Sequence, residues 1–279
     1  MNTICICGAG TMGSGIAQVS ATAGFKTILY DVNEGILQIA KTKIESDLQT
    51  LVEKQKISAN RREDILSQLV FTLDTPNCVA DIIIEAVVEK PEIKTSLFNQ
   101  LATFNSETTL FATNTSSLSV SAIAKEIVHS HRVAGLHFFN PAPVMKLVEV
   151  VRGEQTSDET IAQLITLTKA FGKIPVVCKD APGFIVNRVA RPYYIEALRL
   201  IEEGYADFEM IDRLLESKGF KMGPFKLMDL IGNDVNYAVS CSVYEQLDKP
   251  ERLRPSDIQK EKVDKGELGK KTGKGYYNY

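Results

Sequence analysis

The chain has 279 residues, 44% of them hydrophobic and 24% charged, which is typical of a globular protein with one large core or two smaller ones. Its formal net charge of -3 is spread without a block of like charges, which argues against a nucleic-acid groove or a basic membrane-surface helix. We see no signal peptide, with its charged and then apolar regions, at the start of the sequence, and no apolar run that approaches the length of a membrane span. We therefore expect a cytoplasmic protein that binds small molecules and does not bind nucleic acid or membranes.

The first half of the chain alternates short apolar runs with longer amphipathic ones, a pattern typical of strand–helix–strand units and a parallel sheet. We predict strands at residues 3–7, 26–30, 70–72, 81–84, 109–112 and 132–137. We predict helices at residues 14–23, 34–54, 58–68, 91–104 and 119–125, the third with Ser58 as its N-cap. The continuously apolar strand at 81–84 indicates burial on both faces of the sheet.

The pattern changes after residue 137, where a Pro-rich turn at 140–143 precedes an alternating strand at 147–151. A helix at 158–171 and a strand at 174–178 follow, and then a break at 180–183 opens a long helix that runs to Gly204. The remaining predicted helices cover residues 209–218, 224–231, 233–247 and 257–265. We therefore expect an α/β fold, a Rossmann-type doubly wound and mostly parallel sheet over residues 1–181, with a smaller all-helical domain over 182–279.

We expect the cysteines to be reduced and buried in the core, because they are odd in number, scattered and mostly embedded in apolar stretches. Cys5 and Cys7 lie two apart on a predicted strand and should share one face of it. No histidine stands at a metal-ligand spacing from either, so we expect no metal site. The other cysteines are Cys78, Cys178 and Cys241.

A glycine-rich loop follows the first predicted strand. Gly8 permits the tight turn, Gly10 lets the backbone approach a pyrophosphate, and Gly13 lets the next helix lie close to the strand. The loop, which also contains Thr11 and Met12, presents backbone N–H groups and a positive helix dipole to an anion. Asp31, at the end of the second strand, suits the hydroxyls of an adenine ribose and would repel a 2′-phosphate. This context favours an NAD-binding loop over the alternative interpretation, a glycine-rich turn followed by a surface aspartate that binds no cofactor.

His137 is the candidate acid/base, because it ends a buried strand on the side where the glycine loop leaves the first strand. Oxidation of a secondary alcohol needs a proton acceptor for the hydroxyl, and imidazole suits that task near neutral pH. Glu149 is as far beyond Pro143 as His137 is before it, so the two side chains should meet across a hairpin. The carboxylate would orient the ring and stabilise the imidazolium. His129 and His131 are expected on the surface.

The segment 114–117, Asn-Thr-Ser-Ser, follows another buried strand and should reach the same rim of the sheet. Its hydroxyl and amide groups could contact substrate, or they could form an N-cap for the helix that follows. Ser116 is a candidate for either role, or for both.

Several separated motifs identify a family resemblance. They are residues 8–17 (GAGTMGSGIA), 84–89 (IEAVVE), 114–118 (NTSSL), 137–141 (HFFNP), 182–188 (PGFIVNR) and 269–277 (GKKTGKGYY). In these blocks, and over essentially its whole length, the chain resembles the L-3-hydroxyacyl-CoA dehydrogenases, including the bacterial 3-hydroxybutyryl-CoA dehydrogenases. The resemblance implies an acyl-CoA substrate, His137 as the acid/base, Glu149 as its partner, and a homodimer formed through the C-terminal domain.

The resemblance also implies roles for residues that chemistry alone does not single out. Ser116 and Asn187 should hydrogen-bond the substrate oxygen near C3, and Lys54 should bind a phosphate of coenzyme A. The residues expected along the cofactor are Glu89, Lys94, Asn140 and Lys271. Without the motifs, Asn187 is an ordinary first-turn helix residue, Lys94 a helix-surface lysine, Lys271 a lysine of a polar tail, and Lys54 and Lys56 a solvated helix end.

The sequence therefore predicts reversible, NAD-dependent oxidation of (S)-3-hydroxyacyl-CoA to 3-oxoacyl-CoA. A related dehydrogenase of a non-CoA hydroxy acid, such as a sugar acid, shares many of the motifs. The beta-hydroxyacid dehydrogenases, which use a lysine acid/base, lack the block at 137–141. A catalytically silent NAD-binding protein would have no reason to combine His137, Glu149, Ser116 and Asn187.

Overall fold

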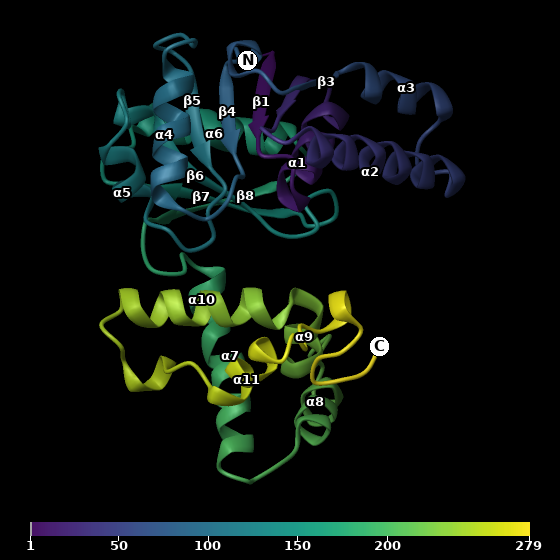
Figure 1. Cartoon of the computed structure of the whole chain (residues 1–279), viewed down its shortest axis with the longest axis vertical. Coiled ribbons are helices and arrows are strands. Elements are labelled where there is room, and N and C mark those ends of the chain that lie inside the picture. The colour runs from purple at the N-terminus through teal and green to yellow at the C-terminus, as the bar shows by residue number, and fades with distance from the viewer. Residues whose placement is uncertain (1) are drawn as a thin grey trace. The chain divides into compact units, whose positions relative to one another are not determined.

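The structure, a computed structural model, describes residues 2–279 and divides after Asp180 into two compact units (Figure 1). We call the part up to Asp180 the first unit and the part from Ala181 to Tyr279 the second unit. Among the described residues, none of the helices is both long and apolar enough to cross a membrane. Nor do these residues gather three or more His, Cys, Asp or Glu side chains in a group that could hold a metal ion.

The first unit is built on one eight-stranded sheet in the order β3-β2-β1-β4-β5-β6-β7-β8. Neighbouring strands run parallel except β6 and β7, which form an antiparallel hairpin. The strands are β1 Thr3–Cys7, β2 Lys26–Tyr30, β3 Leu69–Thr72, β4 Ile82–Glu85, β5 Leu110–Thr113, β6 Val133–Phe138, β7 Leu147–Arg152 and β8 Ile174–Lys179. The helices are α1 Thr11–Thr22, α2 Glu34–Glu53, α3 Ala59–Ser67, α4 Pro91–Ala102, α5 Val120–Lys125 and α6 Asp158–Ala170.

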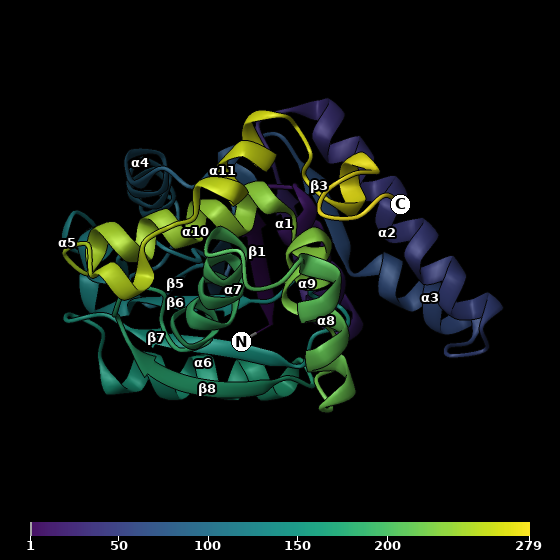
Figure 2. The same ribbon diagram turned by 90° about the horizontal axis from the view of Figure 1, so that it is seen from below.

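Both faces of this sheet are buried, each in its own apolar cluster. Residues such as Ile4 and Ile6 of β1 pack with α1, α2 and α6. The alternate residues Cys5 and Cys7 pack with α4 and α5, and their Sγ atoms lie 3.8 Å apart, so the predicted shared face is confirmed. In Figure 2 the helix α6 runs beside β7 and β8, which it contacts. Helices on both faces of a mostly parallel sheet confirm the predicted Rossmann-type α/β class.

The second unit is all helical. Its helices are α7 Val186–Glu202, α8 Phe208–Ser217, α9 Pro224–Ile231, α10 Asn233–Gln246 and α11 Asp257–Asp264. Phe225 and Met228 of α9 are fully buried and pack with Tyr194 and Leu198 of α7 and with Tyr276 from the end of the chain. A second, smaller cluster joins α7 to α10 through Ile195, Val239 and Val243. The C-terminal residues therefore form part of a helical core.

Two local predictions need correction. The first helix begins at Thr11 instead of residue 14, because Gly10 is its N-cap and Gly13 lies inside its first turn. The N-cap of α5 is Ser119, whose side chain accepts a hydrogen bond from the Ala122 N–H, so Ser116 does not cap that helix. Ser58 does cap α3, as predicted, by accepting from the Arg61 N–H at 3.1 Å.

Candidate active site

The three glycines of the loop after β1 are needed for different reasons. Gly8 has a φ of +96°, and a Cβ there would lie 2.6 Å from the Ala86 carbonyl oxygen, at the end of β4. A Cβ on Gly13 would lie 1.7 Å from the Gly8 carbonyl oxygen, so the helix could not approach the strand. At Gly10, by contrast, an added Cβ would meet nothing within 4 Å. Protein packing explains Gly8 and Gly13, whereas Gly10 leaves open space of the kind that a pyrophosphate would occupy.

We expect alanine substitutions to separate these roles. Gly13→Ala should destabilise the first unit by about 1–3 kcal/mol or more, because the added methyl group overlaps backbone. Gly10→Ala should leave the melting temperature almost unchanged but raise the Kd for NADH about tenfold or more, which corresponds to about 1.4 kcal/mol. Thermal melts and NADH fluorescence titrations measure both quantities. Unaltered NADH affinity in Gly10→Ala would contradict the assignment of this loop.

The start of α1 is suited to an anion. No side chain caps the helix, and its first turn contains no acidic residue, so its positive end is not neutralised from within. Asp31 follows β2 beside this loop and accepts hydrogen bonds from the Ala9 N–H at 2.7 Å and the Asn33 N–H at 2.9 Å. Both features lie at the carboxyl ends of strands. The β1 and β4 strands are neighbours here, at the point where the chain order of the sheet reverses, and such points bind dinucleotides.

His137 and Glu149 face each other across the β6–β7 hairpin, as the symmetry about Pro143 predicted. They are register partners in the antiparallel pair, and His137 Nδ1 lies 2.7 Å from Glu149 Oε2. Glu149 is fully buried and His137 is 6% exposed. Their neighbours in the strands, Leu136 and Val148, belong to the apolar cluster on the opposite face. The pair therefore lies on the α4/α5 face of the sheet, where a buried carboxylate can fix the orientation of an imidazole ring.

Lys94 is buried, not a helix-surface lysine as its local sequence suggested. Only 1% of its side chain is exposed, and its Nζ lies 2.7 Å from Glu85 Oε1 and 3.0 Å from Glu89 Oε2. Glu85 also accepts from the Thr113 hydroxyl and the Val87 N–H, each at 2.7 Å. Burial raises the pKa of Glu85 above its ordinary value, although Lys94 opposes the rise. Sequence reasoning missed Glu85, whose only signal was an acidic residue ending an otherwise apolar strand.

Glu89 joins this charged group to the segment that contains Ser116. It accepts hydrogen bonds from the Thr115 hydroxyl, from the Ser116 N–H at 3.0 Å and from the Ser117 hydroxyl at 3.4 Å. Burial alone would raise its pKa, but Lys94 and these donors hold the pKa of Glu89 below its ordinary value. Two expected cofactor residues and one expected substrate residue thus belong to a single bonded group.

Two further residues hold the strand ends in place: Asn114, whose segment was expected at this rim, and Lys173, which sequence reasoning missed. Asn114 Oδ1 accepts from the Phe138 N–H at 2.8 Å, which ties the end of β5 to the end of β6 beside His137. Lys173 is 8% exposed, and its Nζ donates to the Ala142 and Met145 carbonyls, at 2.5 and 2.7 Å. Burial lowers the pKa of Lys173. This lysine holds the turn that joins His137 to Glu149.

The remaining predicted residues lie on other elements of the two units. Lys54 is exposed and is the C-cap residue that follows α2, and Asn140 is exposed in the β6–β7 turn. Asn187 is half-buried in the first turn of α7, and its carbonyl accepts from Arg191 Nε. Lys271 lies in the second unit and pairs with Asp234, its Nζ 2.6 Å from each carboxylate oxygen.

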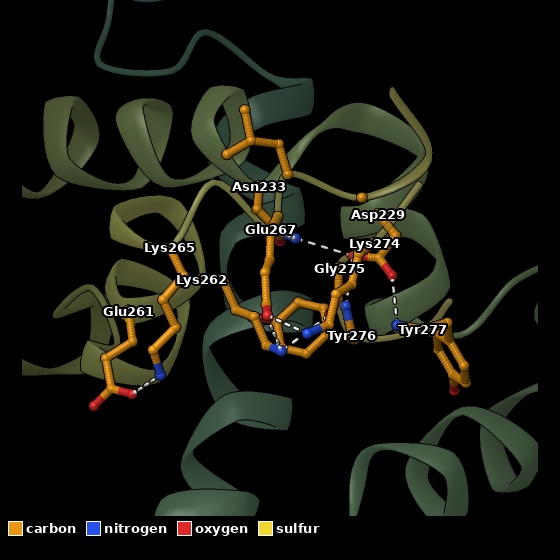
Figure 3. Close-up of polar contacts among 12 residues, drawn as sticks. Asp229, Asn233, Glu261, Lys262, Lys265, Glu267, Lys274, Gly275, Tyr276 and Tyr277 are labelled. Carbon is orange, nitrogen blue, oxygen red and sulfur yellow. Dashed lines mark hydrogen bonds and ion pairs between the residues drawn. The ribbon is translucent and has the colours of Figure 1, made fainter. Parts of the chain in front are cut away.

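The closing motif that contains Lys271 is anchored by a buried carboxylate. Asp229 accepts from the backbone N–H groups of Tyr276 and Tyr277, each at 3.0 Å, and from Asn233 Nδ2 at 2.9 Å (Figure 3). A Cβ on Gly275 would lie 2.0 Å from Asp229 Oδ1, so this glycine permits the approach. Docking of the chain end onto α9 thus explains the glycine and the two tyrosines at the end of this motif.

The doubly wound sheet, the glycine loop and Asp31 define a dinucleotide-binding protein of the Rossmann class, and the buried His–Glu pair adds an imidazole held by a carboxylate. Two family models match consecutive parts of the chain: 3-hydroxyacyl-CoA dehydrogenase, NAD binding domain, at residues 3–181, and 3-hydroxyacyl-CoA dehydrogenase, C-terminal domain, at residues 183–279. The chain belongs to the 3-hydroxyacyl-CoA dehydrogenase family and carries its NAD-binding domain.

Individual relatives agree with this assignment. The chain is 50% identical over 281 residues to the 3-hydroxyadipyl-CoA dehydrogenase of Escherichia coli K12, covering 100% of this chain and 59% of that protein. It resembles a crystal structure of 3-hydroxybutyryl-CoA dehydrogenase from the same organism with a TM-score of 0.96 and 50% identity, over 99% of this chain and 59% of that one. The chain thus spans less than two thirds of the length of these two Escherichia coli proteins. For the (S)-3-hydroxybutyryl-CoA dehydrogenase of Ralstonia eutropha the TM-score is 0.95 at 37% identity, over 100% and 99% of the two chains.

Proposed function

We propose that this chain catalyses the reversible, NAD-dependent oxidation of (S)-3-hydroxyacyl-CoA to 3-oxoacyl-CoA. The observation that carries the proposal is the buried contact of 2.7 Å between His137 Nδ1 and Glu149 Oε2, on the same sheet as the dinucleotide loop. Family membership supports the same reaction. We also propose a cytoplasmic location, supported by the free cysteines Cys5 and Cys7, whose thiols share a hydrogen bond at 3.8 Å instead of a disulfide, because reducing compartments preserve free thiols.

In the proposed oxidation His137 removes the proton of the substrate hydroxyl. Glu149 holds the ring through Nδ1, so the proton is exchanged at Nε2, and the buried carboxylate stabilises the imidazolium that forms. In the reverse direction the imidazolium returns the proton to the oxygen. Ser116 and Asn187 donate hydrogen bonds to that oxygen and stabilise its developing negative charge.

The cofactor proposed for the first domain, residues 1–181, fits the loop after β1. The open space at Gly10, the uncapped start of α1 and the carboxylate of Asp31 suit a pyrophosphate and an adenine ribose. The chemistry that bound NAD supplies is acceptance of a hydride from the substrate carbon. The residues assigned to hold it are Gly8, Gly10, Thr11, Met12, Gly13, Asp31, Glu89, Lys94, Asn140 and Lys271.

A coupled assay distinguishes this activity from its rivals. We expect the protein to oxidise NADH with acetoacetyl-CoA, and to do so far more slowly with free acetoacetate, because Lys54 is assigned to a phosphate of coenzyme A. Comparable rates with free hydroxy or keto acids would favour the non-CoA alternative. NADH binding without oxidation in the presence of acetoacetyl-CoA would instead indicate a catalytically silent protein.

The second domain, residues 182–279, is proposed to contribute substrate contacts and to form a homodimer. Met210 and Leu214 lie one turn apart on α8 and are 57% and 58% exposed, and Phe220 after this helix is 51% exposed. Large apolar side chains gathered on one exposed helix are typical of protein–protein interfaces.

We expect the double variant Met210→Asp, Leu214→Asp to be a monomer, because burying two new carboxylates in an apolar interface is unfavourable. Light scattering after size-exclusion chromatography gives the mass. Ile39→Asp on α2 is the matched control, since Ile39 is 70% exposed on a helix of the first unit and should leave the dimer intact. A monomeric wild-type protein would exclude the proposal.

A further inference from the structure

Arg191 is a buried charge in the second unit whose role no motif explains. It lies on α7 and is 3% exposed. Its Nη1 donates to the Asn236 carbonyl and to the Ser240 hydroxyl, each at 2.8 Å, and its guanidinium carbon lies 4.9 Å from the centre of the Tyr194 ring. These contacts fix the side chain against α10 and orient the guanidinium plane.

All of these partners are neutral. Among residues 2–279, no Asp or Glu side chain forms an ion pair with Arg191, and the hydrogen bonds that hold its guanidinium are made by Nε and Nη1 and not by Nη2. Burial lowers the pKa of Arg191 to about 10. A buried guanidinium is costly unless an anion compensates its charge, and its planar fork matches a carboxylate with two parallel hydrogen bonds. One side of this fork is therefore left for an anion that the chain itself does not supply.

The position of Arg191 relates this charge to the substrate. Its Nε donates to the carbonyl of Asn187, 3.1 Å away, one helical turn earlier on α7. Asn187 is the residue assigned to the substrate oxygen at C3. Side chains four residues apart on a helix are separated by about 5–6 Å at Cβ, a distance that a few carbon atoms of an acyl chain can span.

We propose that Arg191 binds a terminal carboxylate on the acyl chain, so that the preferred substrates are 3-hydroxyacyl-CoA esters of dicarboxylic acids. This inference rests on the proposed function and on the placement of Asn187 at C3. The relative of 50% identity is named 3-hydroxyadipyl-CoA dehydrogenase, and an adipyl chain ends in such a carboxylate. Arg191 is thereby a specificity-determining residue and takes no part in proton or hydride transfer.

Two substrates of equal length test the proposal, because (S)-3-hydroxyadipyl-CoA and (S)-3-hydroxyhexanoyl-CoA differ only in a terminal carboxylate or methyl group. We expect the wild-type kcat/KM to favour the adipyl ester by about ten- to a hundred-fold, the range for a hydrogen bond to a charged group. Equal or higher kcat/KM for the hexanoyl ester would overturn the inference and leave the proposed function intact. Absence of turnover with both esters would refute the proposed function itself.

Variants of Arg191 test whether this residue causes the preference for the adipyl ester. Arg191→Met should reduce the ratio of the two kcat/KM values to about one or below, and Arg191→Lys should retain part of the preference because it keeps the charge without the fork. Ser240→Ala is the matched control, since it removes one partner of Arg191 but keeps the guanidinium, and it should preserve the ratio. A ratio in Arg191→Met equal to that of the wild type would overturn the assignment. General damage to the fold lowers both kcat/KM values together and leaves their ratio high. The ratio, and not either rate alone, therefore tests whether Arg191 binds the terminal carboxylate.

Discussion

His137→Gln is expected to lower kcat for acetoacetyl-CoA reduction by about 10²–10⁴-fold, the contribution typical of a positioned acid/base. Glutamine keeps a polar side chain opposite Glu149 but cannot exchange a proton with the substrate oxygen. The Kd for NADH should remain close to that of the wild type, because the glycine loop and Asp31 lie on other strands. Stopped-flow turnover and NADH fluorescence titration measure the two effects separately.

The chain offers a matched control for this experiment. His131 is an exposed histidine in the loop before β6, and its ring accepts a hydrogen bond from Arg132 Nε at 3.2 Å and lies edge-on to the ring of His129. His131→Gln should therefore leave turnover unchanged. Glu149→Gln should also lower kcat, because a neutral amide stabilises the imidazolium less well than a carboxylate does. Normal turnover in His137→Gln would eliminate the proposed chemistry.

The pairing of His137 with Glu149 was predictable because it depends on local geometry. A Pro-rich turn between two apolar strands predicts a hairpin, and residues equidistant from its centre face each other. The strands themselves were predictable for a similar reason, since short continuous apolar runs between turn residues are typical of a sheet buried on both faces. Of the eight observed strands, β1 and β2 have the predicted bounds, Thr3–Cys7 and Lys26–Tyr30.

The environment of Lys94 was not predictable from its own helix. The local pattern places a lysine near the start of an amphipathic helix, where solvent exposure is the usual outcome. Its burial depends on how α4 packs against the end of β4, because only that packing brings Glu85 within 2.7 Å of its ammonium group. Similarly, the true cap of α5 depends on where the chain turns after β5, so the choice between Ser116 and Ser119 needed the backbone geometry.

Lys94→Met is expected to destabilise the first unit by about 3–5 kcal/mol, the usual cost of removing one partner from a buried ion pair. The loss leaves Glu85, which is fully buried, without the ammonium that compensates its charge. Chemical denaturation monitored by circular dichroism measures the change. Lys43→Met is the control, because Lys43 pairs with Asp47 on the exposed surface of α2 and such pairs contribute about 1 kcal/mol or less.

The pH dependence of this effect distinguishes an electrostatic loss from a packing defect. Burial already raises the pKa of Glu85, and removal of Lys94 should raise it further. A carboxyl whose folded-state pKa lies above its unfolded value favours the folded state while it is protonated, and this contribution is lost as the pH rises through the folded pKa. The variant should therefore be closest to wild type at about pH 5 and should lose stability relative to it toward about pH 8. A difference that stays constant across this range would indicate that Lys94 contributes mainly by filling space.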